Sequence, residues 1–525
     1  MQNSNSTIPI HQQRWFIYSL GGLAVLATLY NILSLLPIFT EYFLFDEATN
    51  LNLGAVMRHQ PLSFLFFTQV GWWRPLGFTL PAIVYLIFGL QVVPFHVIAY
   101  LIHFGTALSL LFLVKKMFNL TAALFAYILY ITSAISVITV GFSTNAFMDE
   151  FSTLLFILVI LVLYRKDRAP ALSLRPYWLA GLFYFLAAAC KDSWVGLIPA
   201  LILMDFLNYK NDKLSYRILR LLPLAFVVII PLGRLAIAGP EKFGVVQSLY
   251  VESYFTFSNL IWGSTIPFLP ALIFNKESPF IITRLIITVL FFTLPVWLVR
   301  SKKMLIAILI VAFVGFWLAL VASPLDPGYG GWLHFPPLIS IAAIIMSITL
   351  YGLIDRFKPH WFFILLSVIW LGIYIVPQYK INYDLYKHTI SMADDFKIDI
   401  NNIKKELSGL PPNSHVYAIG ALDAHLVREN FIPPSIIYTT VSIRKPKIDI
   451  EPRRSNEYKI FDTVPNVLVE GLVPKLDDPN VYIFINARGE FRDVTRNFRQ
   501  IDKEQLQFKN DDELKQIFSD AISKY

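Results

Sequence analysis

Long apolar runs recur along the chain up to residue 377, and they constrain its fold more than any other feature. A helix that crosses a bilayer needs about 20 mostly apolar residues. Eleven runs come close to this length, at roughly 15–39, 94–114, 121–142, 147–164, 174–190, 193–209, 218–237, 280–299, 303–323, 334–354 and 360–377. The sequence therefore predicts a polytopic α-helical membrane protein with about 11 transmembrane helices.

The density of charged side chains divides the chain in two. Residues 1–377 hold 37 charged side chains and residues 378–525 hold 43, so the second part is far more polar. This predicts a transmembrane domain at 1–377 and a soluble domain at 378–525. Segments 415–420, 435–443 and 480–488 have the β-branched and aromatic content of strands. Segments 421–430 and 503–524 resemble helices, so an α/β fold is predicted for the soluble part.

The distribution of basic residues predicts the orientation in the membrane. With the N-terminus in the cytoplasm, cytoplasmic loops hold 16 of the 23 basic residues of 1–377, and outer loops hold 10 of the 14 acidic ones. Eleven spans then place 378–525 on the outer side of the membrane, whereas a miscount by one span would place it inside. We expect a bacterial inner membrane, so that the outer side is the periplasm. The aromatic outer loops at about 40–93 and 238–279 are expected to lie in the interface. An extra or re-entrant span at 76–92 is the alternative.

Two pairs of adjacent carboxylates follow predicted outer boundaries, where acids are costly and suggest function. Asp46 and Glu47 come soon after the first span. Desolvation and like charge raise the pKa of one member of such a pair, which suits a general base for a hydroxyl. Asp149 and Glu150 begin the fourth span and suit binding of an acceptor or a divalent cation. The alternatives are a solvated loop start for the first pair and acids favoured by a helix dipole for the second.

Basic and aromatic residues lie on the same predicted outer side. Arginine binds phosphate through two hydrogen bonds, and indole rings stack on sugars or lipids. The candidates for a donor phosphate are Arg58, Arg74, Lys191, Arg234 and Lys242; those for stacking are Trp72 and Trp73; and Glu252 is a further acceptor candidate. For Lys191, a local pair with Asp192 is the alternative. His96 and His103 share a helix face, which favours packing or hydrogen bonding over catalysis.

Several segments together resemble the C superfamily of membrane glycosyltransferases. These are "FDEATNL", "WWRPLG", "FGLQVVPFHVIAYLIHFG", "STNAFMDEFSTLLFILVILVLYR" and "CKDSWVGLIPALILMDF". The pattern is similar to that of the protein O-mannosyltransferases, including their tetratricopeptide-bearing branch, over roughly residues 15–210. Two departures concern the acceptor and the phosphate site: the tail has no helical repeats, and "GGWLHFPPL" lacks an arginine expected in that branch.

The resemblance implies a reaction. Such enzymes use polyprenyl-phosphate sugars on the extracytoplasmic side, and an acid in the first outer loop serves as base, which would be Asp46 with Glu47 adjacent. The transfer would invert the anomeric centre, and Arg74, Lys191 and Arg234 would stabilise the leaving phosphate. The expected partners are a lipid-phosphate sugar and a protein, glycan or glycolipid acceptor in the cell envelope, without nucleic acid. No cofactor is certain, and a divalent cation stays open.

Other functions fit parts of the same pattern. An O-antigen ligase or polymerase also has many spans and a large outer loop, but is expected to rely on loop arginine and histidine. A transporter needs polar groups at mid-membrane and often inverted repeats, and the sequence shows no such repeat. A scaffold that binds partners through its tail is the non-catalytic alternative.

Overall fold

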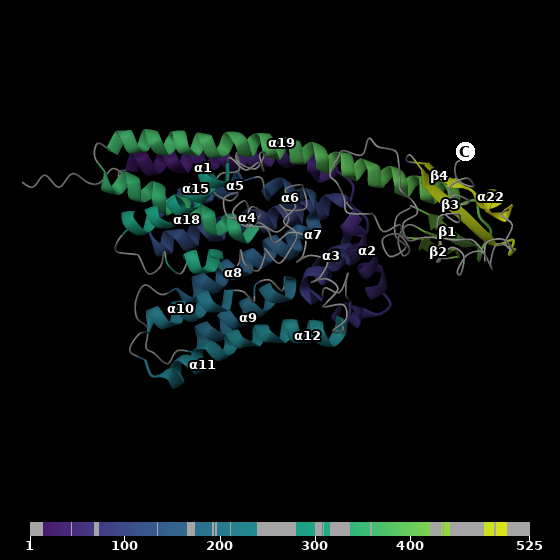
Figure 1. Ribbon diagram of the computed structural model, residues 1–525, viewed down its shortest axis with the longest axis horizontal. Coiled ribbons are helices and arrows are strands. Elements are labelled where there is room, and N and C mark those ends of the chain that lie inside the picture. The colour runs from purple at the N-terminus through teal and green to yellow at the C-terminus, as the bar shows by residue number, and fades with distance from the viewer. Residues whose placement is uncertain are drawn as a thin grey trace, which may run out of the picture. The chain divides into compact units, whose positions relative to one another are not determined.

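The computed structural model describes most of the chain between residues 14 and 500. The described ranges are 14–43, 45–67, 73–133, 135–164, 174–191, 194, 197–209, 212–238, 280–299, 307, 309–314, 336–357, 360–419, 432–433, 435–441, 477–487 and 490–500. The chain forms two compact units: Met1–Thr40, Leu62–Val84 and Gln91–Thr389 make up the first, and Glu41–Pro61, Tyr85–Leu90 and Ile390–Tyr525 the second. Figure 1 labels their helices and strands.

The first unit is built from apolar helices. In chain order they are α1 (Arg14–Leu35), the 3₁₀ turn η2 (Leu36–Thr40), α3 (Pro75–Phe88), α4 (Val92–Met117), α5 (Leu120–Ile131), α6 (Ile135–Gly141), α7 (Ser143–Asn145), α8 (Phe151–Leu163), α9 (Arg175–Cys190), α10 (Ile198–Asn208), α11 (Leu214–Ala225), α12 (Ile229–Ala238), α15 (Phe280–Leu298) and α18 (Pro336–Arg356). A π-helical turn (Ala146–Glu150) joins α7 to α8, and 3₁₀ turns occur at Pro61–Leu65 and Phe226–Val228. The last long helix is α19 (His360–Leu407).

Five helices in the described residues are long and apolar enough to cross a membrane, or six if the bent pair α5 and α6 is one span. They match the predicted spans at 15–39, 94–114, 121–142, 147–164, 218–237 and 334–354. The spans predicted at 174–190, 193–209, 280–299 and 360–377 correspond to α9, α10, α15 and the start of α19. The chain is therefore an integral membrane protein, and the total of eleven spans stays a prediction. The apolar helix α3 lies within the predicted outer loop at 40–93.

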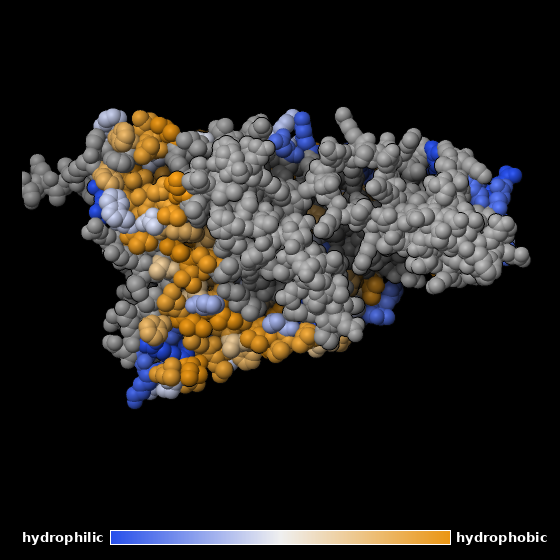
Figure 2. All heavy atoms as spheres, viewed as in Figure 1, coloured by the Kyte–Doolittle hydropathy of each residue, from blue (hydrophilic) through white to orange (hydrophobic). Residues whose placement is uncertain are grey.

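Burial separates the helices of this unit into central and peripheral ones. Nearly every side chain of α5 and α18 is buried, as expected for helices that are apolar all round and pack together in the core. By contrast, α11 exposes Leu214, Ile218, Leu219 and Leu222. Figure 2 shows apolar side chains gathered along α11 and α12. In water such a patch would favour association, so this face suits contact with lipid.

Specific side chains form hydrogen bonds with backbone groups at several helix ends in this unit. The Asn119 side chain accepts a hydrogen bond from the Ala122 amide at 2.9 Å and caps the start of α5. At C-terminal ends, Lys116 donates to the Leu161 carbonyl (2.8 Å) and Arg356 to the Trp297 carbonyl (3.0 Å). Cations there complement the negative end of the helix dipole.

The second unit contains a mixed four-stranded sheet. The strands are β1 (His415–Ile419), β2 (Ile437–Val441), β3 (Val481–Ala487) and β4 (Glu490–Asp493), in the order β2-β1-β3-β4. Strand β1 pairs in parallel with β2 and β3, and β4 is antiparallel to β3. The three predicted strands are confirmed, and β4 was not predicted. The predicted helices at 421–430 and 503–524 lie outside the described residues, so the α/β domain stays an expectation.

Two helices and one ring contact complete the second unit. Helix α2 spans Phe45–Met57 and α22 spans Thr495–Arg499. Tyr42 packs against Phe396 with ring centroids 6.1 Å apart.

The change in composition at residue 377 falls inside a helix. Helix α19 has 48 residues and continues through Pro377 without a break. At 1.5 Å per residue it is about 72 Å long, so only part of it can lie in hydrocarbon about 30 Å thick. The compact units divide at 389 and 390 instead, and the domain limits 1–377 and 378–525 stay a prediction.

Glycine replacements test the close packing of α9 on α11. A Cβ at Gly181 would lie 2.6 Å from the Pro223 carbonyl oxygen, whereas nothing lies within 4 Å of one at Gly22 in α1. Gly181→Ala should destabilise the protein by about 1–3 kcal/mol through overpacking. Gly22→Ala should stabilise it by up to about 1 kcal/mol through helix propensity. The unfolding temperatures of the purified variants measure both effects, and equal shifts would contradict the packing described.

Candidate functional site

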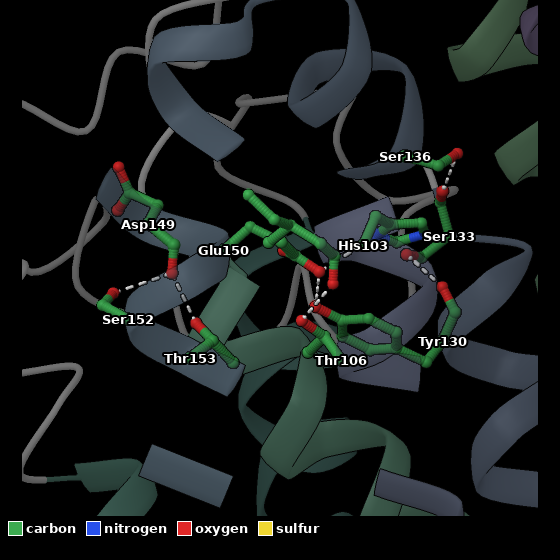
Figure 3. Close-up of polar contacts among 10 residues, drawn as sticks. His103, Thr106, Tyr130, Ser133, Ser136, Asp149, Glu150, Ser152 and Thr153 are labelled. Atoms are coloured by element: carbon green, nitrogen blue, oxygen red, sulfur yellow. Dashed lines mark hydrogen bonds and ion pairs between the residues drawn. The ribbon is translucent and has the colours of Figure 1, made fainter. Parts of the chain in front are cut away.

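The π-helical turn Ala146–Glu150 (hereafter the π turn) places two adjacent carboxylates inside the first unit. Asp149 and Glu150 are both almost fully buried, and Figure 3 shows their side chains pointing to opposite sides of the turn. The Ser152 and Thr153 hydroxyls donate to the Asp149 backbone carbonyl at 2.8 and 2.7 Å. Single π turns often mark functional positions, and here the turn gives each acid its own surroundings.

Asp149 forms an ion pair with Lys191. The Lys191 ammonium donates to Oδ1 of Asp149, and each side chain is only 3% exposed. Lys191 follows directly on the last residue of α9 and has an extended backbone. Removing two charges from water is costly, and only close pairing repays that cost. The partner of Lys191 is thus an acid 42 residues away, while the alternative partner, Asp192, lies outside the described residues.

Glu150 accepts hydrogen bonds on the other side of the π turn. Its Oε1 lies 2.9 Å from Nδ1 of His103 on α4 and 2.7 Å from the Tyr130 hydroxyl on α5. The Tyr130 hydroxyl donates to this oxygen, and His103 donates in the tautomer that carries its proton on Nδ1. The imidazole of His103 also stacks on the Tyr130 ring with centroids 5.4 Å apart. The hydrogen-bonding role expected for the histidines is confirmed, since Nδ1 of His96 lies 2.6 Å from the Val140 carbonyl.

Arg74 directly precedes α3, and this helix packs against the segments that carry both members of the ion pair. Nη1 of Arg74 lies 3.8 Å from Sδ of Met148 in the π turn. One turn later, a Cβ at Gly77 would lie 2.6 Å from the Cys190 carbonyl oxygen and 3.0 Å from Cγ of Met148. Only glycine allows this approach. The fold therefore brings Arg74 next to the segments that carry Asp149 and Lys191.

Trp73 connects the start of α3 to a third basic residue. The indole Nε1 donates to the Leu65 carbonyl at 2.8 Å. The Trp73 ring lies directly against Gly233 on α12. The next residue, Arg234, is buried. Trp73 is itself buried, so in this structure its ring packs on protein and does not face open space for a sugar.

Three basic residues come from neighbouring segments. Arg74, Lys191 and Arg234 belong to segments that pack on one another or on Trp73, while Glu150 turns to His103 and Tyr130. Asp149 pairs with Lys191. Guanidinium and ammonium groups are the side chains that bind anions such as phosphate.

The remaining predicted residues belong to the second unit or lie outside the described residues. Glu47 is buried in the first turn of α2, in the second unit. Asp46 belongs to the same turn, but the structure does not describe its side chain. Arg58 is exposed, with its guanidinium 4.9 Å from the Tyr85 ring centroid, also in the second unit. Trp72, Lys242 and Glu252 lie outside the described residues.

Two sets of contacts were not predicted from the sequence. The first is the contact of Tyr130 with Glu150, because Tyr130 lies in the long apolar run "ALFAYILYI", where local patterning gives no signal. Arg220 is buried and donates to Asp205 at 2.9 Å and to Asp212 at 2.6 Å. Tyr177 donates to the same Asp205 oxygen at 2.8 Å. This second cluster joins α9, α10 and α11 and is explained by packing.

The described residues do not show how a divalent cation would bind. Within them, no group of three or more His, Cys, Asp or Glu side chains is arranged to hold a metal ion. Asp149 and Glu150 point to opposite sides and have separate partners. The two acids therefore do not form a joint cation site in this arrangement, and the cation stays an open prediction.

Comparisons with known proteins place this fold. No protein-family model matches the sequence, and no curated protein sequence matches it. The structure of ArnT from Cupriavidus metallidurans in the apo state is similar, with 14% identity, 89% of this chain and 93% of that chain covered, and a TM-score of 0.51. The structure of ArnT bound to undecaprenyl phosphate gives 13% identity, coverage of 82% and 86%, and a TM-score of 0.51.

The archaeal oligosaccharyltransferase AglB from Archaeoglobus fulgidus, in complex with an inhibitory peptide and a dolichol-phosphate, matches at 11% identity. The match covers 81% of this chain and 65% of that chain, with a TM-score of 0.49.

The similarity to ArnT concerns the fold. At the level of the fold, this similarity agrees with the resemblance predicted from the sequence. Identity of 14% leaves the substrate and the roles of individual residues to be argued from the site.

A double-mutant cycle tests the buried ion pair. Asp149→Leu and Lys191→Met should each destabilise the protein by about 3–5 kcal/mol, because each leaves one buried charge without its partner. The double variant should be less destabilised than the sum of the two, since neither charge is then present. Unfolding free energies measure the coupling. Lys115→Met, at an exposed lysine, is the control, and strictly additive effects at 149 and 191 would contradict the pairing.

Proposed function

We propose that this chain is an integral-membrane glycosyltransferase. It moves a sugar from a polyprenyl-phosphate donor to a hydroxyl of an extracytoplasmic acceptor, which is a protein, a glycan or a glycolipid. The observation that carries the proposal is the buried ion pair of Asp149 and Lys191, with Arg74 beside the π turn that carries Asp149. The fold shared with ArnT, one structure of which is bound to undecaprenyl phosphate, agrees with it.

The chemistry of the cluster suits a lipid phosphate. Guanidinium groups bind phosphate oxygens through paired hydrogen bonds, and a lysine ammonium supplies a point charge. Lys191 pairs with Asp149 and, as an ammonium group with three N–H donors, suits a contact with a phosphate oxygen as well. Asp149 thus serves as the group that holds Lys191 in place. Burial strengthens these interactions because water does not screen them.

The reaction is a single inverting displacement. The acceptor hydroxyl transfers its proton to the Asp46 carboxylate, and its oxygen attacks the anomeric carbon of the donor sugar. The bond between that carbon and the phosphate oxygen breaks, and the electron pair leaves with the phosphate. Arg74 and Lys191 offset the charge that develops there. Glu47, in the same helical turn as Asp46, is the second carboxylate of the pair.

The proposed orientation places this chemistry outside the cytoplasm. His103 contacts Glu150 and Lys116 contacts Leu161, so α4 and α8 run in parallel. The C-terminal end of α4 carries Lys115 and Lys116, which the positive-inside rule assigns to the cytoplasm, and the C-terminal end of α8 lies beside it. The π turn precedes α8 and so lies toward the opposite side. A bacterial inner membrane with a periplasmic C-terminal part fits this orientation.

The first test removes the proposed base. Asp46→Asn should lower transfer from a labelled polyprenyl-phosphate sugar by about 10²–10⁴-fold, the usual contribution of a general base. Membrane insertion and unfolding temperature should stay unchanged. The labelled product of the wild-type protein also identifies the acceptor class. Full activity of Asp46→Asn would eliminate Asp46 as the base, and no labelled product with any acceptor would refute a transferase.

The second test separates donor from acceptor binding. Arg74→Ala should raise KM for the donor about 10- to 100-fold, because a hydrogen bond to a charged group contributes about 1.5–3 kcal/mol. KM for the acceptor should not change. Lys115→Ala removes an exposed cation at the cytoplasmic end of α4 and is the matched control. An equal change in both KM values would count against a phosphate role for Arg74.

A further inference from the structure

The contacts of Glu150 lead to an inference about neighbouring Asp149. Glu150, His103 and Tyr130 are all fully buried in the first unit. In the part of the chain that the structure describes, both hydrogen bonds of the carboxylate end on Oε1, one from α4 and one from α5. Within the described residues, Oε2 of Glu150 and Nε2 of His103 have no hydrogen-bond partner. Loss of either donor therefore leaves the buried carboxylate with a single hydrogen bond.

The π turn connects the hydrogen-bonded Glu150 directly to Asp149. Asp149 and Glu150 are the last two residues of the five-residue turn. The hydroxyls of Ser152 and Thr153 hold the Asp149 carbonyl from the first turn of α8 (Figure 3). The Asp149 backbone is thus held by hydroxyl groups of α8, and the Glu150 side chain is held by α4 and α5. If Glu150 were released, the turn could relax and the contact with Lys191 would loosen.

We propose that His103, Glu150 and Tyr130 form a positioning network that fixes the π turn and thereby holds Asp149 against Lys191. The effect of this network on donor binding rests on the proposed function, in which Lys191 binds the donor phosphate. The effect of the network on the local structure around Lys191 is independent of the proposed function. The three residues position other groups and are not catalytic, since His103 is stacked on Tyr130 and enclosed by protein.

Cys190 provides a readout that needs no activity. It is the one cysteine in the sequence, it precedes Lys191, and it is buried. The start of α3 covers its backbone at Gly77. Alkylation of Cys190 by a maleimide in the purified full-length protein therefore measures how often this region opens.

Two pairs of matched variants separate hydrogen bonding from general destabilisation. Tyr130→Phe and Tyr127→Phe each remove one hydroxyl from α5, but the Tyr127 hydroxyl bonds Thr28 at 2.7 Å and not Glu150. His103→Leu removes the donor to Glu150, whereas His103→Asn keeps an N–H near the position of Nδ1. Tyr130→Phe and His103→Leu should speed alkylation by about tenfold or more, since labelling follows the population of the open state. Tyr127→Phe and His103→Asn should stay close to the wild type.

Donor binding tests the same network through Lys191. His103→Leu should weaken binding of polyprenyl phosphate to the purified protein about tenfold, and the same substitution should have little effect when Lys191→Ala is present. His103→Asn should restore binding. A merely structural defect would weaken binding equally in both backgrounds.

The outcomes distinguish the two proposals. Faster alkylation in Tyr130→Phe and His103→Leu alone supports the network even if the wild type neither binds polyprenyl phosphate nor transfers sugar, in which case the proposed function fails. Unchanged alkylation in these variants overturns the network even in an active enzyme. Alkylation that rises equally in Tyr127→Phe, or equally in His103→Asn and His103→Leu, also overturns it, because loss of packing would then be the cause.

Discussion

The ion pair between Asp149 and Lys191 is the interaction on which the candidate site depends. Each charge would be prohibitive alone in an interior with few polar groups, so the end of α9 and the π turn must meet. Gly77 then lets α3 approach both segments, which brings Arg74 to the same place. The site is thus defined by one requirement, that buried charge be paired, together with one contact that only a glycine permits.

The same requirement explains other features of the membrane part. Glu150 has His103 and Tyr130, and Arg220 has Asp205 and Asp212. Because helices carry unpaired carbonyls at their C-terminal ends, Lys116 and Arg356 find partners there. These groups hold the helices in register. The network around Asp149 differs in that Arg74 lies beside the same π turn.

Local sequence patterns predicted what depends on local physics. Apolar runs fix where helices form in lipid, so the described helices match the predicted spans, and β-branched runs located three strands. Contacts between distant residues leave no such pattern. Lys191 pairs with Asp149, 42 residues away along the chain, and Tyr130 lies in an apolar run, so no local pattern indicates either contact. The change in charge at 377 indicated a boundary, yet α19 continues because composition alone does not end a helix. The roles of Asp46 and Glu47 stay predictions.

The enclosure of α18 has a consequence for biosynthesis. Its side chains are buried on nearly every side, and it packs on α5 and α15, which are made earlier. A nascent chain that ends before Pro336 therefore lacks the helix that fills the centre of the bundle. The helices already inserted must leave a lateral opening for it until translation has passed residue 356. Premature termination in this interval would present an unfilled apolar groove to membrane quality-control proteases.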